Sequence, residues 1–175
     1  MEIHRFEKLW TGASLLLIVL FISTVTYGTV VVGVEMVDDS GGTIDADSLG
    51  DHPQFGDPGV RATTEDGELT ADAYVVARQF LFQPGTASPI RVPADTRVTF
   101  HVTSADVVHG FSVVGTNVNT MVIPGQVAEI TVKFSETGEY GLVCHEYCGS
   151  GHHDMAGTIQ VVPRSQFFND TEVTT

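Results

Sequence analysis

Lysine and cysteine are scarce in this sequence, and basic residues as a whole are few. Lysine occurs only at Lys8 and Lys133, and 8 basic residues stand against 22 acidic ones, which gives a formal net charge of -14. This balance argues against a nucleic-acid-binding protein, because the chain would repel phosphate groups instead of neutralising them. An acidic, lysine-poor surface favours a protein adapted to high salt, and an ordinary acidic extracellular protein is the alternative.

The low cysteine content also limits the fold class. Two cysteines are too few for a small domain held together by disulfides. Only 17% of the residues are charged and 42% are hydrophobic, so the chain as a whole is not of the disordered class. With 175 residues it has room for one globular domain and additional segments, since domains commonly contain ~100–200 residues.

Residues 9–34 contain no charged side chain and predict a transmembrane helix. A helix of this length, rising ~1.5 Å per residue, crosses a ~30 Å hydrocarbon layer with some tilt. Arg5 and Lys8 precede the segment, and acidic residues follow it. The positive-inside rule therefore predicts a single-pass protein of the plasma membrane, with residues 1–8 in the cytoplasm and the rest on the extracellular or periplasmic side.

A cleaved signal peptide is the alternative interpretation of this segment. The hydrophobic part of a signal peptide is shorter, ~7–15 residues, and ends at a cleavage site of small residues. Here the apolar run continues to Val34 without such a site. The pattern therefore favours a retained anchor, and no later segment is long and apolar enough for a second crossing.

The composition and the hydrophobic pattern of the sequence change near Ala73. Residues 35–72 are acidic, rich in Gly, Asp and Thr, and predict an extracellular linker. After it, residues 97–103 and 128–134 alternate between apolar and polar side chains, which is typical of half-buried strands. We therefore predict a mainly β domain at 73–163, a sandwich or small barrel, followed by a C-terminal tail at 164–175. Further strand-like runs occur at 73–82, 111–114, 139–144 and 157–162.

Residues 144–155 contain most of the side chains that could bind a metal ion. This segment, predicted as a loop between two strands, contains both cysteines, three histidines and Met155. Thiolate and thioether ligands select copper, whereas a structural zinc site rarely uses methionine. Cys144 and Cys148 could each bridge a pair of copper ions, and each ion would then need one imidazole. His152 supplies one, and His109, which lies between two predicted strands, is our candidate for the second.

Each candidate also has an ordinary structural interpretation. The cysteines could form a disulfide, although so short a loop gives little entropic stabilisation. Met155 could be a core residue. We predict that His101 is a solvated side chain on the polar face of its strand, and that His145 and His153 lie beside the metal ligands without binding the metal.

The motif Cys144-x-Glu146-x-Cys148-Gly149-x-x-His152-x-x-Met155 resembles the binuclear copper (CuA) loop of subunit II of haem–copper cytochrome c oxidases. The segments around His109, at 115–117 and at 124–126 are similar to the cupredoxin domain of that family, and 137–140 resembles the cupredoxin tyrosine turn. The resemblance covers 73–162 and implies a cupredoxin-like Greek-key β-sandwich. A single N-terminal transmembrane helix resembles the ba3-type branch.

The resemblance also implies a role for each ligand. Cys144 and Cys148 would be the bridging thiolates. His109 and the weak axial Met155 would belong to one copper, and His152 and the backbone carbonyl of Glu146 to the other. In another branch the side chain of that Glu helps to hold magnesium or manganese, whereas the ba3-type branch lacks this ion. A second metal at Glu146 therefore stays open.

By this resemblance the chain is the electron-accepting subunit of a terminal oxidase. It would take electrons from a cytochrome c or a small blue-copper protein and pass them to haem in subunit I for oxygen reduction. A membrane-tethered copper carrier or assembly protein is the alternative function, and a disulfide-bonded β adhesin is a weaker one. Four aromatic residues could form an apolar surround for the metal or a docking patch: Phe80, Phe82, Phe111 and Tyr147. The alternative is that they belong to the core of the sandwich, and we favour this alternative for Phe111.

Overall fold

The computed structural model describes residues 4–30, 41–65 and 68–170, and these form two compact units that we treat separately. The first unit contains the helix α1 (Arg5–Val30), and its stretch Arg5–Gly28 is long and apolar enough to cross a membrane. Its large apolar side chains are exposed all round, Trp10 and Leu16 to 71%. An apolar surface on every side suits a hydrocarbon environment. Residues 31–34 of the predicted span lie outside the described residues.

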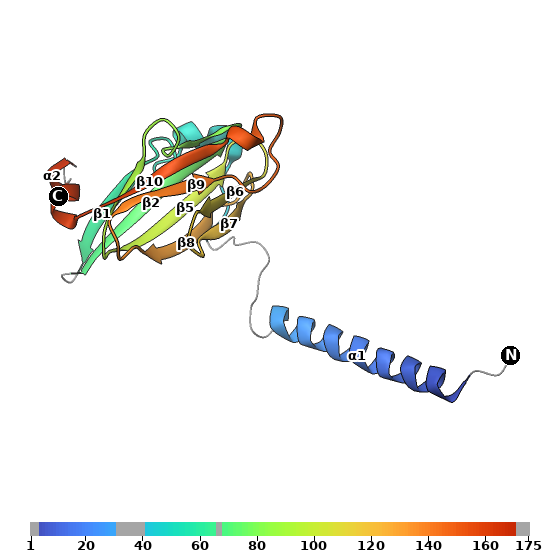
Figure 1. Ribbon diagram of the computed structural model, residues 1–175. Coiled ribbons are helices and arrows are strands. Elements are labelled where there is room, and N and C mark those ends of the chain that lie inside the picture. The colour runs from blue at the N-terminus through green and yellow to red at the C-terminus, as the bar shows by residue number, and fades with distance from the viewer. Residues whose placement is uncertain (1–3, 31–40, 66–67, 171–175) are drawn as a thin grey trace. The chain divides into compact units, whose positions relative to one another are not determined.

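The second unit is built from two five-stranded sheets packed face to face (Figure 1). In the first sheet the order is β1 (Val60–Glu65), β2 (Glu68–Arg78), β5 (Arg97–Ser104) and β8 (Ala128–Lys133), and β3 (Leu81–Gln83) pairs with β2. In the second sheet it is β4 (Ile90–Pro93), β10 (Ala156–Val162), β9 (Gly138–Val143), β6 (His109–Val113) and β7 (Asn119–Val122).

Two of the strand pairs in these sheets are parallel, β2 with β5 and β4 with β10, and the other ladders are antiparallel. A parallel pair needs a crossover, so the chain passes between the sheets several times instead of forming only hairpins. The predicted mainly β, cupredoxin-like sandwich with one N-terminal apolar helix is confirmed.

The core between the sheets follows the two-residue period of the strands. Val98, Phe100 and Val102 on β5 are fully buried, as their alternation predicts. Phe111, also fully buried, meets Phe82 edge-on with ring centroids 6.0 Å apart, which confirms its assignment to the core. Each such side chain contributes about 1.5–3 kcal/mol by burial. This packing gives the loops at the sandwich ends a rigid base.

Residues 41–72, within the predicted linker 35–72, contain regular structure. They form η1 (Ala46–Asp51), β1 and the first part of β2. Leu49 and Phe55 are buried in a small second core against Val76 and Val127, on the outer face of the first sheet. The acidic residues between these anchors leave no apolar period in the sequence, although a few large side chains hold the segment in place.

The predicted tail also contains an element. Helix α2 (Arg164–Asp170) follows β10, and its Phe167 side chain is buried. Residues 171–175 of the predicted tail lie outside the described residues. Two adjacent phenylalanines, Phe167 and Phe168, in a seven-residue helix give too weak a pattern to predict from the sequence.

Two turns lie before strands of the domain, one before β8 and one at the start of β9. Gly125 follows Pro124 and has a φ of 85°, a conformation that favours glycine. At the start of β9, the Tyr140 hydroxyl donates to the Glu136 carbonyl over 3.2 Å, as expected for the tyrosine turn. The turn fixes the base of the strand that leads into Cys144.

Candidate metal centre

The predicted loop at 144–155 connects two neighbouring antiparallel strands. Val143 at the end of β9 pairs with Ala156 at the start of β10. The Cys144 N–H donates to the Met155 carbonyl over 3.2 Å and closes the base of the loop. Within it lies one turn of 3-10 helix, η2 (His152–Asp154). The two sheet strands therefore hold both ends of the loop in register.

The two thiols lie side by side inside this loop. Their Sγ atoms are 3.9 Å apart, and Cys144 and Cys148 are only 7% and 3% exposed. A disulfide needs ~2.05 Å between the sulfurs, so this arrangement is a pair of free thiols and the disulfide interpretation fails. Since a metal–thiolate bond is ~2.3 Å, one ion reaches two sulfurs up to about 4.6 Å apart.

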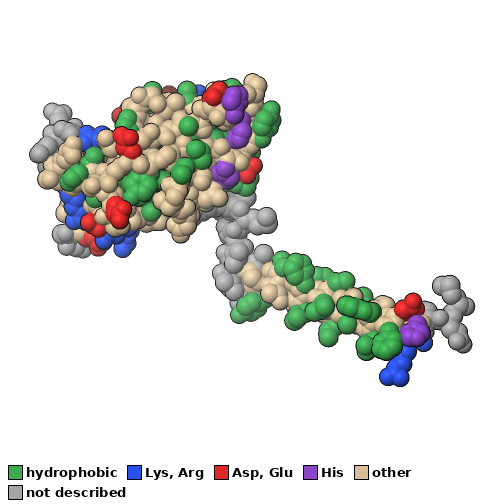
Figure 2. Space-filling view, in the orientation of Figure 1, with side chains coloured by type: hydrophobic (Ala, Val, Ile, Leu, Met, Phe, Trp, Pro, Cys, Tyr) green, Lys and Arg blue, Asp and Glu red, His purple; other side chains and the backbone are tan. Residues whose placement is uncertain are grey.

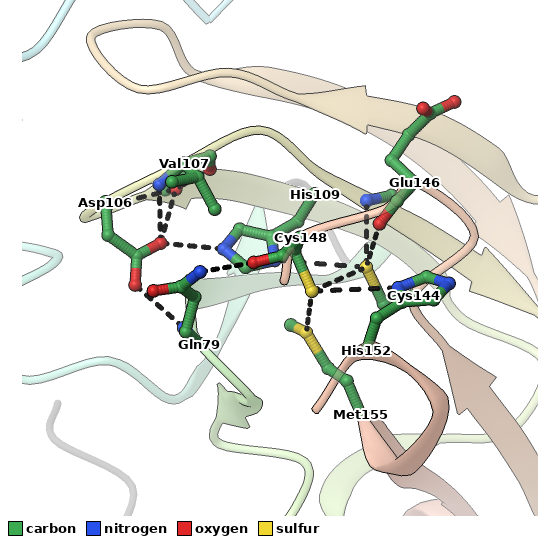
Figure 3. Close-up of polar contacts among 11 residues, drawn as sticks. Gln79, Asp106, Val107, His109, Cys144, Glu146, Cys148, His152 and Met155 are labelled. Carbon is green, nitrogen blue, oxygen red and sulfur yellow. Dashed lines mark hydrogen bonds and ion pairs between the residues drawn. The ribbon is translucent and has the colours of Figure 1, made fainter. Parts of the chain in front are cut away.

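His109, the predicted ligand from outside the loop, is the first residue of β6 and points toward the thiols. Its ligand atom and the two Sγ atoms all lie within 4.8 Å of one another. The Nε2–H donates to the Asp106 carboxylate over 2.7 Å, which leaves the Nδ1 lone pair directed toward Cys144 Sγ, 3.8 Å away (Figure 3). A carboxylate behind a histidine fixes the ring and its tautomer in metal sites.

The remaining predicted ligands surround the second thiol and the mouth of the loop. His152 Nδ1 is 3.7 Å and Met155 Sδ 3.6 Å from Cys148 Sγ. The Glu146 backbone oxygen is 3.2 Å from Cys144 Sγ, while its carboxylate, on a side chain 43% exposed, points away from the sulfurs (Figure 3). The fold thus gathers all six predicted ligand residues around one point.

The other histidines lie outside this group. The His145 ring packs over Gly110, and the His153 side chain is 75% exposed beside Asp154. The prediction that His101 is solvated is wrong. It does face away from the thiols, but its side chain is only 15% exposed, stacked on Tyr74 between the carboxylates of Asp72 and Glu129. A sequence shows the polar face of a strand but not its cross-strand neighbours.

Two ionisable groups at the site depart from their ordinary behaviour. Burial and the neighbouring Cys144 raise the pKa of the Cys148 thiol to about 11. Burial opposes ionisation of Asp106. Hydrogen bonds from the Gln79 N–H, from His109 and from the Val107 N–H outweigh it and hold the pKa of that carboxyl below its ordinary value. The site therefore keeps a protonated thiol beside an ionised carboxylate.

Asp106 and Gln79 belong to the site but were not predicted from the sequence. Asp106 precedes His109 by three residues, and an acidic residue so near a candidate ligand is a signal that could have been used. Gln79 is 69 positions from Cys148, to whose carbonyl its amide donates, and no local pattern indicates that contact.

The surface above the centre combines histidines with exposed apolar side chains. Tyr147 is 79% exposed in the loop, and Val107 and Leu81, close in sequence to His109 and Phe80, are 37% exposed. Figure 2 shows histidine side chains gathered at this end of the domain beside apolar ones. Phe82 and Phe111 belong to the core, so of the predicted aromatic surround only Phe80 and Tyr147 lie at the loop.

The donor set fits copper. Two thiols, a thioether and imidazoles are soft ligands, and the sulfurs lie close enough for shared ions. The thioether is 2% exposed and contributes nothing to a zinc site, which is built from thiolate, imidazole and carboxylate. The residues present therefore suit a copper centre better than a structural zinc site.

Comparison with known proteins agrees with this chemistry. Residues 61–162 match the family described as "Cytochrome C oxidase subunit II, periplasmic domain". A cytochrome c oxidase subunit 2 of Thermus thermophilus is 37% identical over 161 residues, 91% of this chain and 93% of that protein. Another from Thermus thermophilus is 40% identical over 118 residues, 67% and 84% of the two chains.

A chain in the cryo-EM structure of a heme-copper terminal oxidase dimer shares 30% identity, covering 90% of this chain and 100% of that one, with a TM-score of 0.49. The two Thermus thermophilus relatives are subunits of cytochrome c oxidase, an oxidoreductase complex. The family is membrane-associated, and the part that matches this chain is described as a periplasmic domain. The chain belongs to the cytochrome c oxidase subunit II family.

Proposed function

We propose that this chain is the electron-accepting subunit of a terminal haem–copper oxidase and that residues 144–155, with His109, hold a binuclear copper (CuA) centre. The observation that carries the proposal is the pair of buried thiols 3.9 Å apart, each with its own imidazole less than 4 Å away. Cys144 and Cys148 would hold both ions through their thiolates. His109 and Met155 would serve one copper, and His152 and the Glu146 carbonyl the other.

When bound, the two copper ions would supply one-electron redox chemistry between the donor protein and haem in subunit I. The protein's contribution is rigidity. The strands β9 and β10 hold the loop ends, and Asp106 holds the His109 ring through a 2.7 Å hydrogen bond. Ligands that do not move need little reorganisation when the charge of the centre changes. The burial of both sulfurs excludes water from the space between them.

The exposed apolar residues beside the loop support a docking role. We propose that a cytochrome c or a small blue-copper protein docks on Leu81, Val107 and Tyr147, which are 37%, 37% and 79% exposed. Large apolar side chains exposed together at a functional site commonly mark a protein contact. From there, electrons would enter through the loop that carries the thiols.

The proposal includes the placement of each segment. Residues 1–8 are cytoplasmic, 9–34 span the membrane, and the copper domain that follows, which includes β1 and α2, lies on the extracellular or periplasmic side. Arg5 and Lys8 before the helix support this orientation. The net charge of -14 supports adaptation to high salt. Metal analysis of the assembled oxidase for magnesium and manganese decides whether Glu146 also holds a second ion.

Oxygen consumption by the assembled oxidase tests the function. We expect Cys148→Ser to abolish consumption driven by a reduced donor protein, while a small reductant that reaches subunit I directly still supports it. Ser150→Ala, an exposed position of the same loop, is the matched control and should keep both activities.

The copper-carrier alternative predicts a different pattern. If the chain only delivered copper during assembly, Cys148→Ser would remove both activities together, because subunit I would lack its own copper. That result, or unchanged donor-driven activity, contradicts the proposed function.

A further inference from the structure

The turn between β2 and β3 lies against the metal loop, although it is far from it in sequence. Gln79 follows the last residue of β2, and its side-chain amide donates to the backbone carbonyl of Cys148 (Figure 3). A carbonyl held by a donor from another element cannot rotate freely, so this contact fixes the peptide next to the second thiol.

Phe80 continues the contact along the loop. A Cβ atom on Gly151 would approach the Phe80 ring to 2.5 Å, and a Cβ atom on Gly149 would lie 2.8 Å from Gln79 Nε2. Gly149 also has a φ of 131°, where other residues are strained. The loop therefore uses two glycines to let this turn approach its backbone closely.

The same turn is tied to the other side of the centre. The Gln79 N–H donates to Asp106 Oδ2 over 2.7 Å, and Asp106 Oδ1 accepts from His109 Nε2, also over 2.7 Å. A continuous series of contacts thus runs from the Cys148 carbonyl through Gln79 and Asp106 to the His109 ring. These contacts connect Cys148 in the loop to His109 on β6 through Gln79, which belongs to neither the loop nor β6.

We propose that Gln79 is a positioning residue of the copper centre, which sets the Cys148 peptide relative to His109. This inference rests on the proposed function. Gln79 is an exposed residue beyond the end of β2, whereas that strand is anchored by fully buried residues such as Val75 and Ala77. The side chain is therefore expected to act on the geometry of the loop and not on the stability of the sandwich.

The test uses the full-length chain in detergent with two variants of equal charge change. Gln79→Glu keeps the size of the side chain but replaces the donating amide by an oxygen that repels the Cys148 carbonyl. Gln83→Glu, at an exposed glutamine of β3, is the matched control. Three quantities are measured: the alkylation rate of Cys148 relative to Cys144 without metal, the affinity and EPR spectrum with copper, and the melting temperature without metal.

We expect Gln79→Glu to raise the relative alkylation rate of Cys148 about fivefold, the factor that corresponds to the loss of one ordinary hydrogen bond. Copper affinity should fall about 10–100-fold with an altered EPR spectrum, as for other residues that orient metal ligands. The metal-free melting temperature should match that of Gln83→Glu.

The inference is overturned if Gln79→Glu equals Gln83→Glu in alkylation and copper binding, or if its metal-free melting temperature falls, which would reveal a general structural role. The alkylation result does not depend on copper. A wild-type chain that binds no copper would refute the proposed function, while the alkylation ratio would still decide whether Gln79 positions Cys148.

Discussion

His109 is useful as a ligand because Asp106 determines which of its nitrogens carries the proton. An ionised carboxylate accepts hydrogen bonds only, so the 2.7 Å contact requires Nε2–H and leaves Nδ1 free. The same carboxylate accepts from two backbone N–H groups, which holds it in place. One side chain therefore fixes both the tautomer and the direction of an imidazole from outside the loop.

Replacing Asp106 by asparagine tests this arrangement. Asp106→Asn keeps the shape but loses one acceptor and the charge, so we expect copper affinity to fall about 10–100-fold. Competition with a chelator measures the affinity, and Asp154→Asn, at a side chain 80% exposed in the loop 144–155, is the control. Equal affinities of the two variants would show that Asp106 does not orient His109.

The lowered pKa of Asp106 gives this residue a pH signature. The pKa of Asp106 is lower in the folded protein than in the unfolded chain, where it is 3.8. The ionised carboxylate therefore stabilises the fold above pH 3.8, and this stabilisation is lost as the pH falls through the pKa of the folded state. The difference in metal-free melting temperature between wild type and Asp106→Asn should therefore shrink below about pH 4. A difference that stays constant there would contradict the assigned ionisation.

The raised pKa of Cys148 makes copper uptake depend on pH. A bridging thiolate must lose its proton, and with a pKa of about 11 the thiol is protonated at neutral pH. We expect the apparent copper affinity of the full chain to rise at least about tenfold per pH unit between about pH 6 and pH 8. A pH-independent affinity, measured by chelator competition in each buffer, would exclude Cys148 as a protonated ligand.

Strand β10 begins directly after Met155, and its first residues are fixed by the segment before β4. Thr86 Oγ1 donates to the Ala156 carbonyl over 2.7 Å, and the Thr158 N–H donates to the Gly85 carbonyl over 2.9 Å. A Cβ atom on Gly157 would lie 2.9 Å from the Gly85 backbone, which cannot move aside. The close approach of these two backbones sets where the metal loop ends.

Gly157→Ala should therefore lower the free energy of unfolding by about 1–3 kcal/mol through overpacking. Gly59→Ala is the control, because its Cβ atom would enter open space. Denaturant unfolding of the full chain in detergent measures both. Equal stabilities would mean that this contact is looser than the structure indicates.

The sequence predicts elements whose pattern is local and misses those that depend on distant partners. Strands such as β5 and β8 alternate with period two, and the loop at 144–155 collects its ligands within a few positions. By contrast, η1 and β1 lie in an acidic segment, where two anchors, Leu49 and Phe55, find their partners only after folding. His109 could be inferred from ligand chemistry, but the contact between Gln79 and Cys148 has no local signature.

The charge of the whole molecule determines how it meets a partner. At a net charge of -14, long-range forces would be strong in dilute salt. At molar salt, however, the Debye length falls to about 3 Å, so apolar contact at Tyr147 and its neighbours should dominate. We expect stopped-flow electron-transfer rates with the donor protein to vary little across high salt concentrations. A steep fall in rate as salt increases would show that charge steering dominates instead.

The central claim is that two cysteines bridge a pair of copper ions, and the EPR spectrum of the copper-loaded full chain tests it most directly. We predict two coppers per chain and a multi-line spectrum, because an electron shared by two copper nuclei couples to both. In Cys148→Ser this spectrum should disappear. One copper per chain with the spectrum of an isolated ion, or a Cys148→Ser protein with the wild-type spectrum, would contradict the account.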